Sequence, residues 1–248
     1  MFSEKISKEY IVKQQGTSEG TQIKYKKGDY WYKKDKSGCE GLVEYLVSNF
    51  LGYTNLNAEE YVVYEYGTIN GEKGCRSKNF LKSNEELITL YRLYFNEYGR
   101  DLSQVINEMD EMEDRIDYVI RFVEKSCGIN IFEYLKKVLT VDMIILNEDR
   151  HLNNLALIFD GNAFKPSPIF DNGLSLLTGN RSVNWKFPVS DNVKRVVARP
   201  FSGSHEKMVE YFGKGLEIDA ESALSWLNTQ KWTREREVLE YQINKYCQ

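Results

Sequence analysis

Three side chains in the second half of the chain have the types and spacing that phosphoryl transfer needs. Asp149 and Asn154 are five positions apart in a polar loop, and Asp171 stands two residues before Gly173, at the end of a candidate hairpin. A kinase needs a carboxylate that accepts or orients the substrate hydroxyl, and an amide oxygen and a second carboxylate that hold Mg²⁺ against the phosphates of ATP. The pattern predicts catalytic roles for all three residues, with Asn154 and Asp171 as the metal ligands.

Each of these pieces has a plainer interpretation when it is taken alone. Asp149 could simply cap a loop, and Asp171-Asn172-Gly173 could be an ordinary turn. His151 could orient the loop through hydrogen bonds, and its sequence neighbours include no second histidine. The order of the pieces, namely an apolar helix, an Asp-Arg-His loop, a hairpin and an Asp-x-Gly segment, is what favours the kinase interpretation.

Hydrophobic spacing predicts a β-rich first part of the chain. Residues 40–50 carry apolar side chains at the spacing of an amphipathic helix. Short runs with strand character flank this helix, and they cover residues 22–25, 30–33 and 60–66. A turn over Lys27-Gly28-Asp29 separates the first two strands.

After Gly74 the spacing predicts mainly helices. The predicted helices cover residues 87–94 behind a capping box at 83–86, then 114–125, 130–146 and the part after Glu206. One hairpin interrupts them, with strands at 155–159 and 163–170 around Asp160-Gly161. The expected fold class is therefore α+β, a bilobal protein-kinase-like fold. Its small β-rich N-lobe covers residues 1–68, and its larger, mainly helical C-lobe covers residues 69–248.

The two polar motifs resemble those of the HipA-like kinases. The match covers Asp149-Arg150-His151-Leu152-Asn153-Asn154 and Ile169-Phe170-Asp171-Asn172-Gly173. These relatives are bacterial serine/threonine kinases of toxin–antitoxin systems and smaller CtkA-like forms. The Asp-Arg-His order also resembles that of phosphatidylinositol kinases. The resemblance implies that the first Asp is the catalytic base, that the Asn and the later Asp bind Mg²⁺, and that an antitoxin is a candidate partner.

A Gly-containing segment near the start is similar to the HipA phosphate loop. The residues that carry this similarity are Gly16, Thr17, Ser18, Gly20 and Gln22. Glycines let backbone N–H groups approach phosphates, so these residues are assigned to ATP binding. The resemblance also makes Thr17 and Ser18 candidates for autophosphorylation. A flexible turn is the plainer interpretation of the same residues.

A kinase also needs a strand lysine on the α- and β-phosphates, and a helix glutamate that steadies it. Lys33 ends a predicted strand, and Lys34 points to the opposite face of that strand. Glu40 and Glu44 lie one turn apart on the following helix, so either could be the partner, with Glu40 as the first choice.

Three further residues are assigned to the nucleotide. The segment Val63-Tyr64-Glu65-Tyr66 is expected to form the interlobe hinge that takes the adenine, so Glu65 and Tyr66 are placed with the ATP-binding residues. His151 of the polar loop is placed with them.

The composition is that of a globular protein in the cytoplasm. The net charge is -4, which gives no reason to expect direct nucleic-acid binding. No secretory signal and no apolar run long enough for a membrane span is present. Four scattered cysteines and two histidines predict reduced thiols and no zinc site.

The sequence leaves several alternatives to a protein serine/threonine kinase. A lipid or small-molecule kinase could use the same Asp-Arg-His motif, although no polybasic cluster points to a membrane face. A pseudokinase could bind nucleotide without turnover, and a plain helical domain would leave the clustering unexplained. The identity of the protein substrate cannot be predicted from the residues around 178–203.

Overall fold

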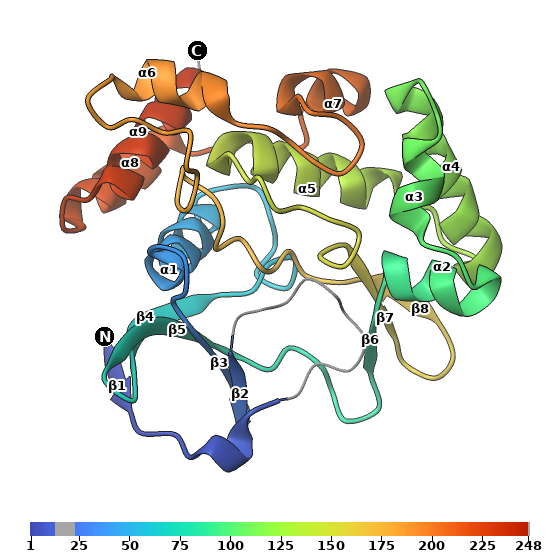
Figure 1. Ribbon diagram of the computed structural model, residues 1–248, viewed down its shortest axis with the longest axis horizontal. Helices are drawn as coiled ribbons and strands as arrows, with labels where there is room; N and C mark the ends of the chain where they lie inside the picture. Colours follow the sequence, from blue (N-terminus) through green and yellow to red (C-terminus); the bar gives the residue numbers. More distant parts are fainter. Residues whose placement is uncertain (13–22, 248) are drawn as a thin grey trace. The chain divides into compact units, whose positions relative to one another are not determined.

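The computed structural model describes residues 1–12 and 23–247 (Figure 1). The chain is divided between two compact units. Unit 1 comprises Met1–Phe80, Phe170–Val196 and Glu217–Gln248, and unit 2 comprises Leu81–Ile169 and Val197–Leu216. Within the described ranges, the helices are too short or too polar to cross a membrane.

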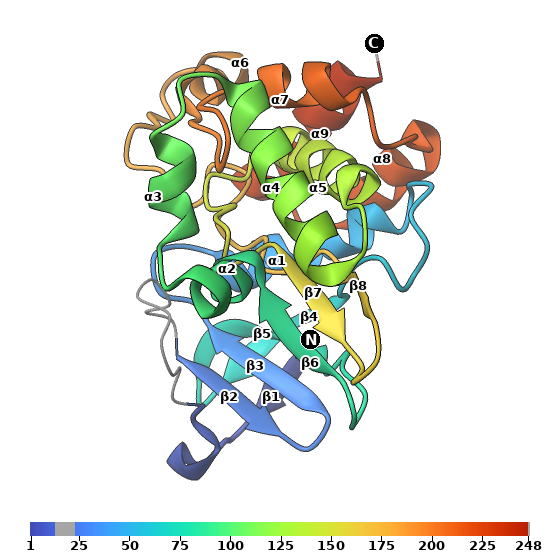
Figure 2. The same cartoon turned by 90° about the vertical axis from the view of Figure 1, so that its right-hand side faces the viewer.

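Unit 1 is built around a five-stranded sheet with the strand order β1-β4-β5-β3-β2. Strand β1 runs parallel to β4, and the other neighbours are antiparallel. The strands cross one another at an angle in Figure 2, as expected of a twisted sheet. Their bounds are β1 Phe2–Glu4, β2 Lys24–Lys27, β3 Tyr30–Lys34, β4 Tyr64–Ile69 and β5 Glu72–Lys78.

Helix α1, Glu40–Leu51, packs against β4 and β5 of this sheet. Its apolar residues Val43, Leu46, Val47 and Phe50 are buried, as their spacing predicted. The turn between β2 and β3 is also as predicted, and Gly28 has the positive φ of 57° that such a tight turn needs. Three more helices complete unit 1, namely α6 Val189–Asn192, α8 Ala220–Thr229 and α9 Arg234–Tyr246.

Unit 2 is mainly helical, with α5 at the centre of its buried residues. Helix α5, Phe132–Ile145, buries most of its length and packs against α7. A three-stranded sheet with the order β6-β7-β8 lies beside the helices. The strands are β6 Glu86–Thr89, β7 Ala156–Phe159 and β8 Phe164–Pro166, and the other helices are α2 Leu90–Tyr98, α3 Leu102–Asn107, α4 Met112–Cys127 and α7 His205–Phe212.

The predicted helix behind the capping box is wrong in its first half. Residues Glu86–Thr89 form strand β6, which pairs with β7, and α2 begins only at Leu90. The helix cap is Thr89, whose hydroxyl accepts a hydrogen bond from the N–H of Arg92 at 3.1 Å. Pairing with the buried β7 outweighs the local capping signal at Ser83. Strand β5 likewise extends the β-rich part beyond Gly74, where mainly helices were expected.

Both units are assembled from stretches that are separate in the sequence. The predicted domains, residues 1–68 and 69–248, are two continuous stretches instead. These domain boundaries stay a prediction from the sequence. The fold class is confirmed, because the N-terminal region forms a β-sheet and the C-terminal part is mainly helical.

Candidate functional site

Lys33 is the centre of a buried ion-pair chain in unit 1. Its ammonium lies 2.9 Å from a carboxylate oxygen of Glu44 and 2.7 Å from one of Asp171. The second carboxylate oxygen of Glu44 accepts a hydrogen bond from the backbone N–H of Asn172 at 3.1 Å. The structure therefore joins the predicted lysine to the predicted metal-binding Asp through strand β3, helix α1 and the segment after β8.

The first choice of Glu40 as the lysine partner is wrong. Its carboxylate accepts hydrogen bonds from three consecutive backbone N–H groups, at 3.1, 2.6 and 3.1 Å, those of Lys36, Ser37 and Gly38. Because α1 begins at Glu40, this side chain caps the preceding turn. Glu44, one turn further along, is the residue that reaches Lys33.

Two residues of the cluster were given no role on the basis of the sequence. The ammonium of Lys24 lies 3.3 Å from the other carboxylate oxygen of Asp171. The hydroxyl of Tyr64 accepts a hydrogen bond from the backbone N–H of Asp171, at 3.4 Å. Lys24 could have been found, because the β2–β3 hairpin places it directly opposite Lys33. Tyr64 carries no comparable local signal.

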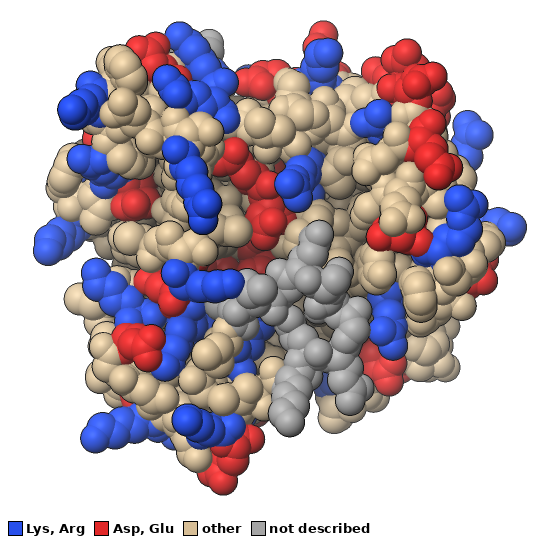
Figure 3. Space-filling model, in the orientation of Figure 1, with Lys and Arg blue, Asp and Glu red and all other residues tan. Residues whose placement is uncertain are grey.

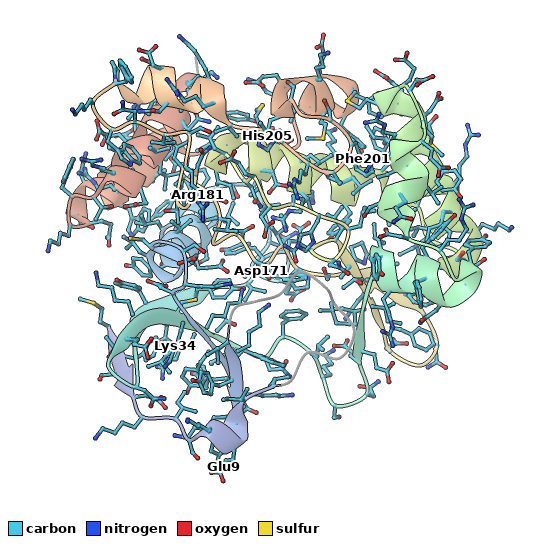
Figure 4. The ribbon with its side chains drawn as sticks, viewed as in Figure 1. Glu9, Lys34, Asp171, Arg181, Phe201 and His205 are labelled. Carbon is cyan, nitrogen blue, oxygen red and sulfur yellow. The ribbon has the colours of Figure 1, made fainter. Side chains whose placement is uncertain are left out.

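Asp171 itself has a backbone φ of 60°, in the left-handed region that non-glycine residues rarely adopt. Such conformations cost free energy, and they persist only where the surroundings hold them. Here two cations and the Tyr64 hydroxyl hold the residue. Figure 4 labels Asp171 among the side chains of unit 1.

The opposing charges set the ionisation of this cluster. Burial disfavours a charged lysine, but Asp171 and Glu44 outweigh it and raise the pKa of Lys33 well above its ordinary value. Burial also works against an ionised Asp171, yet Lys33 and Lys24 lower the pKa of this carboxyl far below its ordinary value. Burial raises the pKa of Glu44 in spite of Lys33. Asp171 is thus the firmly anionic member, as a metal ligand must be.

Asp149 and Asn154 lie together in the polar loop that follows α5 in unit 2. The side-chain amide of Asn154 donates a hydrogen bond to the backbone carbonyl of Asp149 at 3.1 Å. Asn154 is buried, whereas the Asp149 side chain is 39% exposed. The ring of His151 lies 4.0 Å from the Asp149 carboxylate. A catalytic base needs an accessible carboxylate, which Asp149 provides. A metal ligand needs a side chain in a fixed position, and the hydrogen bond fixes the amide of Asn154.

A buried charge pair fixes this loop to α5. The guanidinium of Arg150 binds both carboxylate oxygens of Asp142 at 2.9 Å, and it donates to the backbone carbonyl of Asn154 at 3.2 Å. The amide of Asn147 donates to the same Asp142 carboxylate at 2.9 Å. Arg150 and Asp142 are fully buried. Sequence reasoning missed this pair, although a lone Asp inside an apolar helix signals a buried partner.

The hinge assignment is not supported. Glu65 and Tyr66 lie inside strand β4, paired with Arg76 and Cys75 of β5. The Glu65 carboxylate binds the guanidinium of Arg76 at 2.8 Å. The chain passes from unit 1 to unit 2 only after Phe80. The β-character of residues 60–66 was right, but the strand continues where a linker was expected.

Five predicted ATP contacts lie outside the described residues. They are Gly16, Thr17, Ser18, Gly20 and Gln22. Their assignment to the phosphate loop therefore stays a prediction from the sequence.

The oxygen donors fit Mg²⁺ better than a closed metal cage. In the described part of the chain, no group of three or more His, Cys, Asp or Glu side chains is gathered to hold a metal ion. Mg²⁺ bound with a nucleotide needs only one or two protein oxygens, because the phosphates and waters supply the rest. The ionised Asp171 and the Asn154 amide oxygen are donors of this kind.

No family model matches the sequence, and no curated protein matches it. Solved structures resemble the fold, and CtkA and HipA are among those found. The Helicobacter pylori proinflammatory kinase CtkA aligns with a TM-score of 0.61 at 15% identity, over 94% of this chain and 90% of that chain. HipA of Shewanella oneidensis MR-1, solved with HipB and operator DNA, aligns with a TM-score of 0.43 at 8% identity, over 98% of this chain and 66% of that chain. The likeness to CtkA shows that the chain has the fold of that kinase.

Proposed function

We propose that the chain is a Mg²⁺-dependent protein serine/threonine kinase of the HipA-like type, acting in the cytoplasm. The reaction would move the γ-phosphoryl group of ATP to a protein hydroxyl. One observation carries the proposal, namely the buried chain Glu44–Lys33–Asp171 on the fold of a kinase. A lysine held by a helix glutamate, with an Asp that binds metal, is the combination that phosphoryl-transfer enzymes of this kind need.

In this proposal each group has one task. The ammonium of Lys33 contacts the α- and β-phosphates, and Glu44 keeps it in place. Bound Mg²⁺ supplies positive charge that offsets the charge of the phosphates, and Asp171 and Asn154 hold it through oxygen atoms. Asp149 accepts the proton of the substrate hydroxyl. Positioning and electrostatics, rather than covalent chemistry, would then lower the barrier.

The test is transfer of label from γ-³²P-ATP to proteins of the cognate cell lysate. The wild-type chain should label a protein on serine or threonine only when Mg²⁺ is present. Asp149→Asn and Asp171→Asn should each lower the rate by a factor of about 100 or more while keeping the folded structure. Glu86→Gln, on an exposed side chain of β6, is the matched acid-to-amide control and should keep full turnover.

Each other outcome has a definite meaning. Label on a lipid or a small molecule, without labelled protein, would replace the protein acceptor with the alternative class. Nucleotide binding without transfer would identify a pseudokinase. An antitoxin partner and autophosphorylation at Thr17 or Ser18 are further parts of the proposal. Phosphosite mapping after incubation with Mg-ATP tests the autophosphorylation, with Asp149→Asn as the inactive control.

A further inference from the structure

A basic surface with exposed aromatic rings lies on unit 1, where two distant segments meet. Helix α6 packs against α9, and the guanidinium of Arg234 lies 4.9 Å from the ring centre of Trp185. Figure 3 shows Lys and Arg side chains gathered where Figure 1 places α6 and the loop before it. We call this region the basic surface, and its members are Arg181, Trp185, Lys186, Phe187, Lys231 and Trp232.

Three cations of the basic surface lack an acidic partner. The side chains of Arg181, Lys186 and Lys231 are exposed, and none makes an ion pair with any described residue. Neighbouring cations are already engaged. Lys194 binds Asp191 at 3.2 Å, and Arg195 donates to the backbone carbonyl of Ser182 at 2.9 Å. The surface therefore keeps positive charge that its own chain leaves unbalanced.

Two aromatic side chains are exposed in the same two segments, Phe187 before α6 and Trp232 before α9. Phe187 is 49% exposed and Trp232 is 62% exposed. Large aromatic residues beside arginine are enriched in protein–protein interfaces, where they supply much of the binding free energy. Single exposed apolar residues are ordinary, but two beside unpaired cations match a partner that has both negative charge and an apolar anchor.

The acidic partner is a polypeptide rather than a nucleic acid because of two acids near the cations. Asp191 and Glu235 lie in the same two segments, and their carboxylates would repel a continuous phosphate backbone. A polypeptide can space its carboxylates to meet the separate cations and avoid these two acids.

We propose that the basic surface docks an acidic segment of the acceptor protein, with an apolar side chain of that segment against Phe187 and Trp232. This inference rests on the proposed function for its biological meaning, because it names the chemical class of the kinase substrate. The docking itself needs neither ATP nor turnover. It is therefore measured independently of catalysis.

The experiment measures fluorescence anisotropy of a labelled peptide with the full chain and no nucleotide. The probe is a serine-containing peptide rich in Asp and Glu with one central Leu. Its controls are the same peptide with Asn and Gln in place of the acids, and a single-stranded oligothymidylate of equal length. The test variant is Arg181→Glu with Lys186→Glu. Lys5→Glu with Lys8→Glu makes the same charge change at exposed positions beside β1.

Binding of the acidic peptide by the wild type and by the Lys5/Lys8 variant is expected. The Arg181/Lys186 variant should bind at least about tenfold more weakly, and Trp232→Ala should also weaken binding. Equal binding by all variants, or no binding to the acidic peptide, overturns the inference. Oligothymidylate binding as tight as peptide binding overturns it in favour of a nucleic-acid surface.

The two proposals fail in different ways. A chain that transfers phosphate normally but shows no surface-dependent peptide binding keeps its proposed function and loses this inference. A chain that docks the peptide through Arg181 and Lys186 but never transfers phosphate keeps the docking surface and loses the kinase assignment. The Arg181/Lys186 variant and Trp232→Ala should keep the wild-type melting temperature. This result excludes misfolding as the cause of weak binding.

Discussion

At the scale of single residues, the nitrogen of Lys33 gathers three oxygen atoms. Beside the two carboxylates, the hydroxyl of Tyr64 lies 3.4 Å from the ammonium. Burial raises the pKa of this tyrosine above its ordinary range, so its oxygen stays neutral. The ammonium of a buried lysine can use three hydrogen-bond acceptors, and here all three are provided. Lys33 is therefore a cation held in one position by its three acceptors.

We predict that Glu44→Gln removes one charge from this arrangement and lowers the rate of phosphoryl transfer about a hundredfold. The amide keeps the shape of the side chain, but it holds the Lys33 ammonium less firmly. A catalytic group that is misplaced by about 1 Å can lower the rate by this factor. Steady-state kinetics of the purified variant measure the effect. The melting temperature should also fall, because the amide NH2 replaces an oxygen that accepts a hydrogen bond from Lys33 or from the N–H of Asn172.

The matched control is Glu40→Gln on the same helix. It weakens three hydrogen bonds from backbone N–H groups, so it should cost about 1–2 kcal/mol of unfolding free energy with turnover largely kept. The reverse result, with turnover lost in Glu40→Gln and kept in Glu44→Gln, would show that Glu40 supports the lysine after all.

His205, the first residue of α7, gives a prediction about pH. It is buried, and it lies near the backbone of Asn147 and the Asp142–Arg150 pair. Burial lowers its pKa below the ordinary 6.5, although Asp142 and Glu206 act in the opposite direction and Arg150 adds to the lowering. Below pH 6.5 the unfolded chain therefore takes up a proton that the folded chain refuses.

Folding stability should accordingly fall as the pH drops from 7.5 to 5.5, and this part of the fall should vanish in His205→Phe. Urea unfolding at several pH values measures the slope. An unchanged slope in the variant would mean that groups other than His205 account for it.

At the scale of elements, the start of α2 has two candidate N-cap residues, Ser83 and Thr89. Ser83 begins a capping-box sequence, but Thr89 makes the hydrogen bond to the first turn of α2. We predict that Thr89→Ala destabilises the chain by about 1 kcal/mol, while Ser83→Ala is neutral within roughly 0.5 kcal/mol. Denaturant unfolding of both variants decides the matter. A larger loss in Ser83→Ala would contradict the helix start at Leu90.

How far elements can be predicted depends on where their partners lie in the chain. Helix α1 follows from its own apolar spacing, and the separation of Lys33 from Lys34 follows from strand alternation. Strand β6 could not be predicted in the same way, because Glu86 pairs with Phe159, far along the sequence. The choice between Glu40 and Glu44 depended on how α1 packs against β3, which the spacing within the helix does not give.

At the scale of the whole molecule, Mg-ATP should stabilise the folded chain. A ligand that binds only the folded state adds about 2.7 kcal/mol at one hundred times its Kd, which corresponds to several degrees in melting temperature for a chain of this size. EDTA should remove most of this gain, and Asp171→Asn should do the same. A thermal shift that is equal with and without metal would contradict the role of Asp171.

The predicted site residues carry clearer signals in the sequence than the residues that support them. Asp149, Asn154, Asp171 and Lys33 carry recognisable spacing or strand position, so their neighbourhoods could be anticipated. Arg150 and Asp142 act through burial and tertiary contact, which sequence spacing does not report. The hinge was misplaced for a related reason, since only the sheet pairing shows that β4 continues past Tyr66.

The assembly of unit 1 from three stretches has a consequence for synthesis on the ribosome. The hydroxyl of Tyr45 on α1 donates to Gln230 at 3.1 Å, and Thr54 bridges to Ile218. Since translation is vectorial, the sheet and α1 emerge well before the helices that complete their packing. A nascent chain that has not reached residue 217 holds the first-made part of unit 1 with apolar surface uncovered, which is the state that chaperones bind. Closure of this unit must therefore wait until the segment that begins at Glu217 has been made.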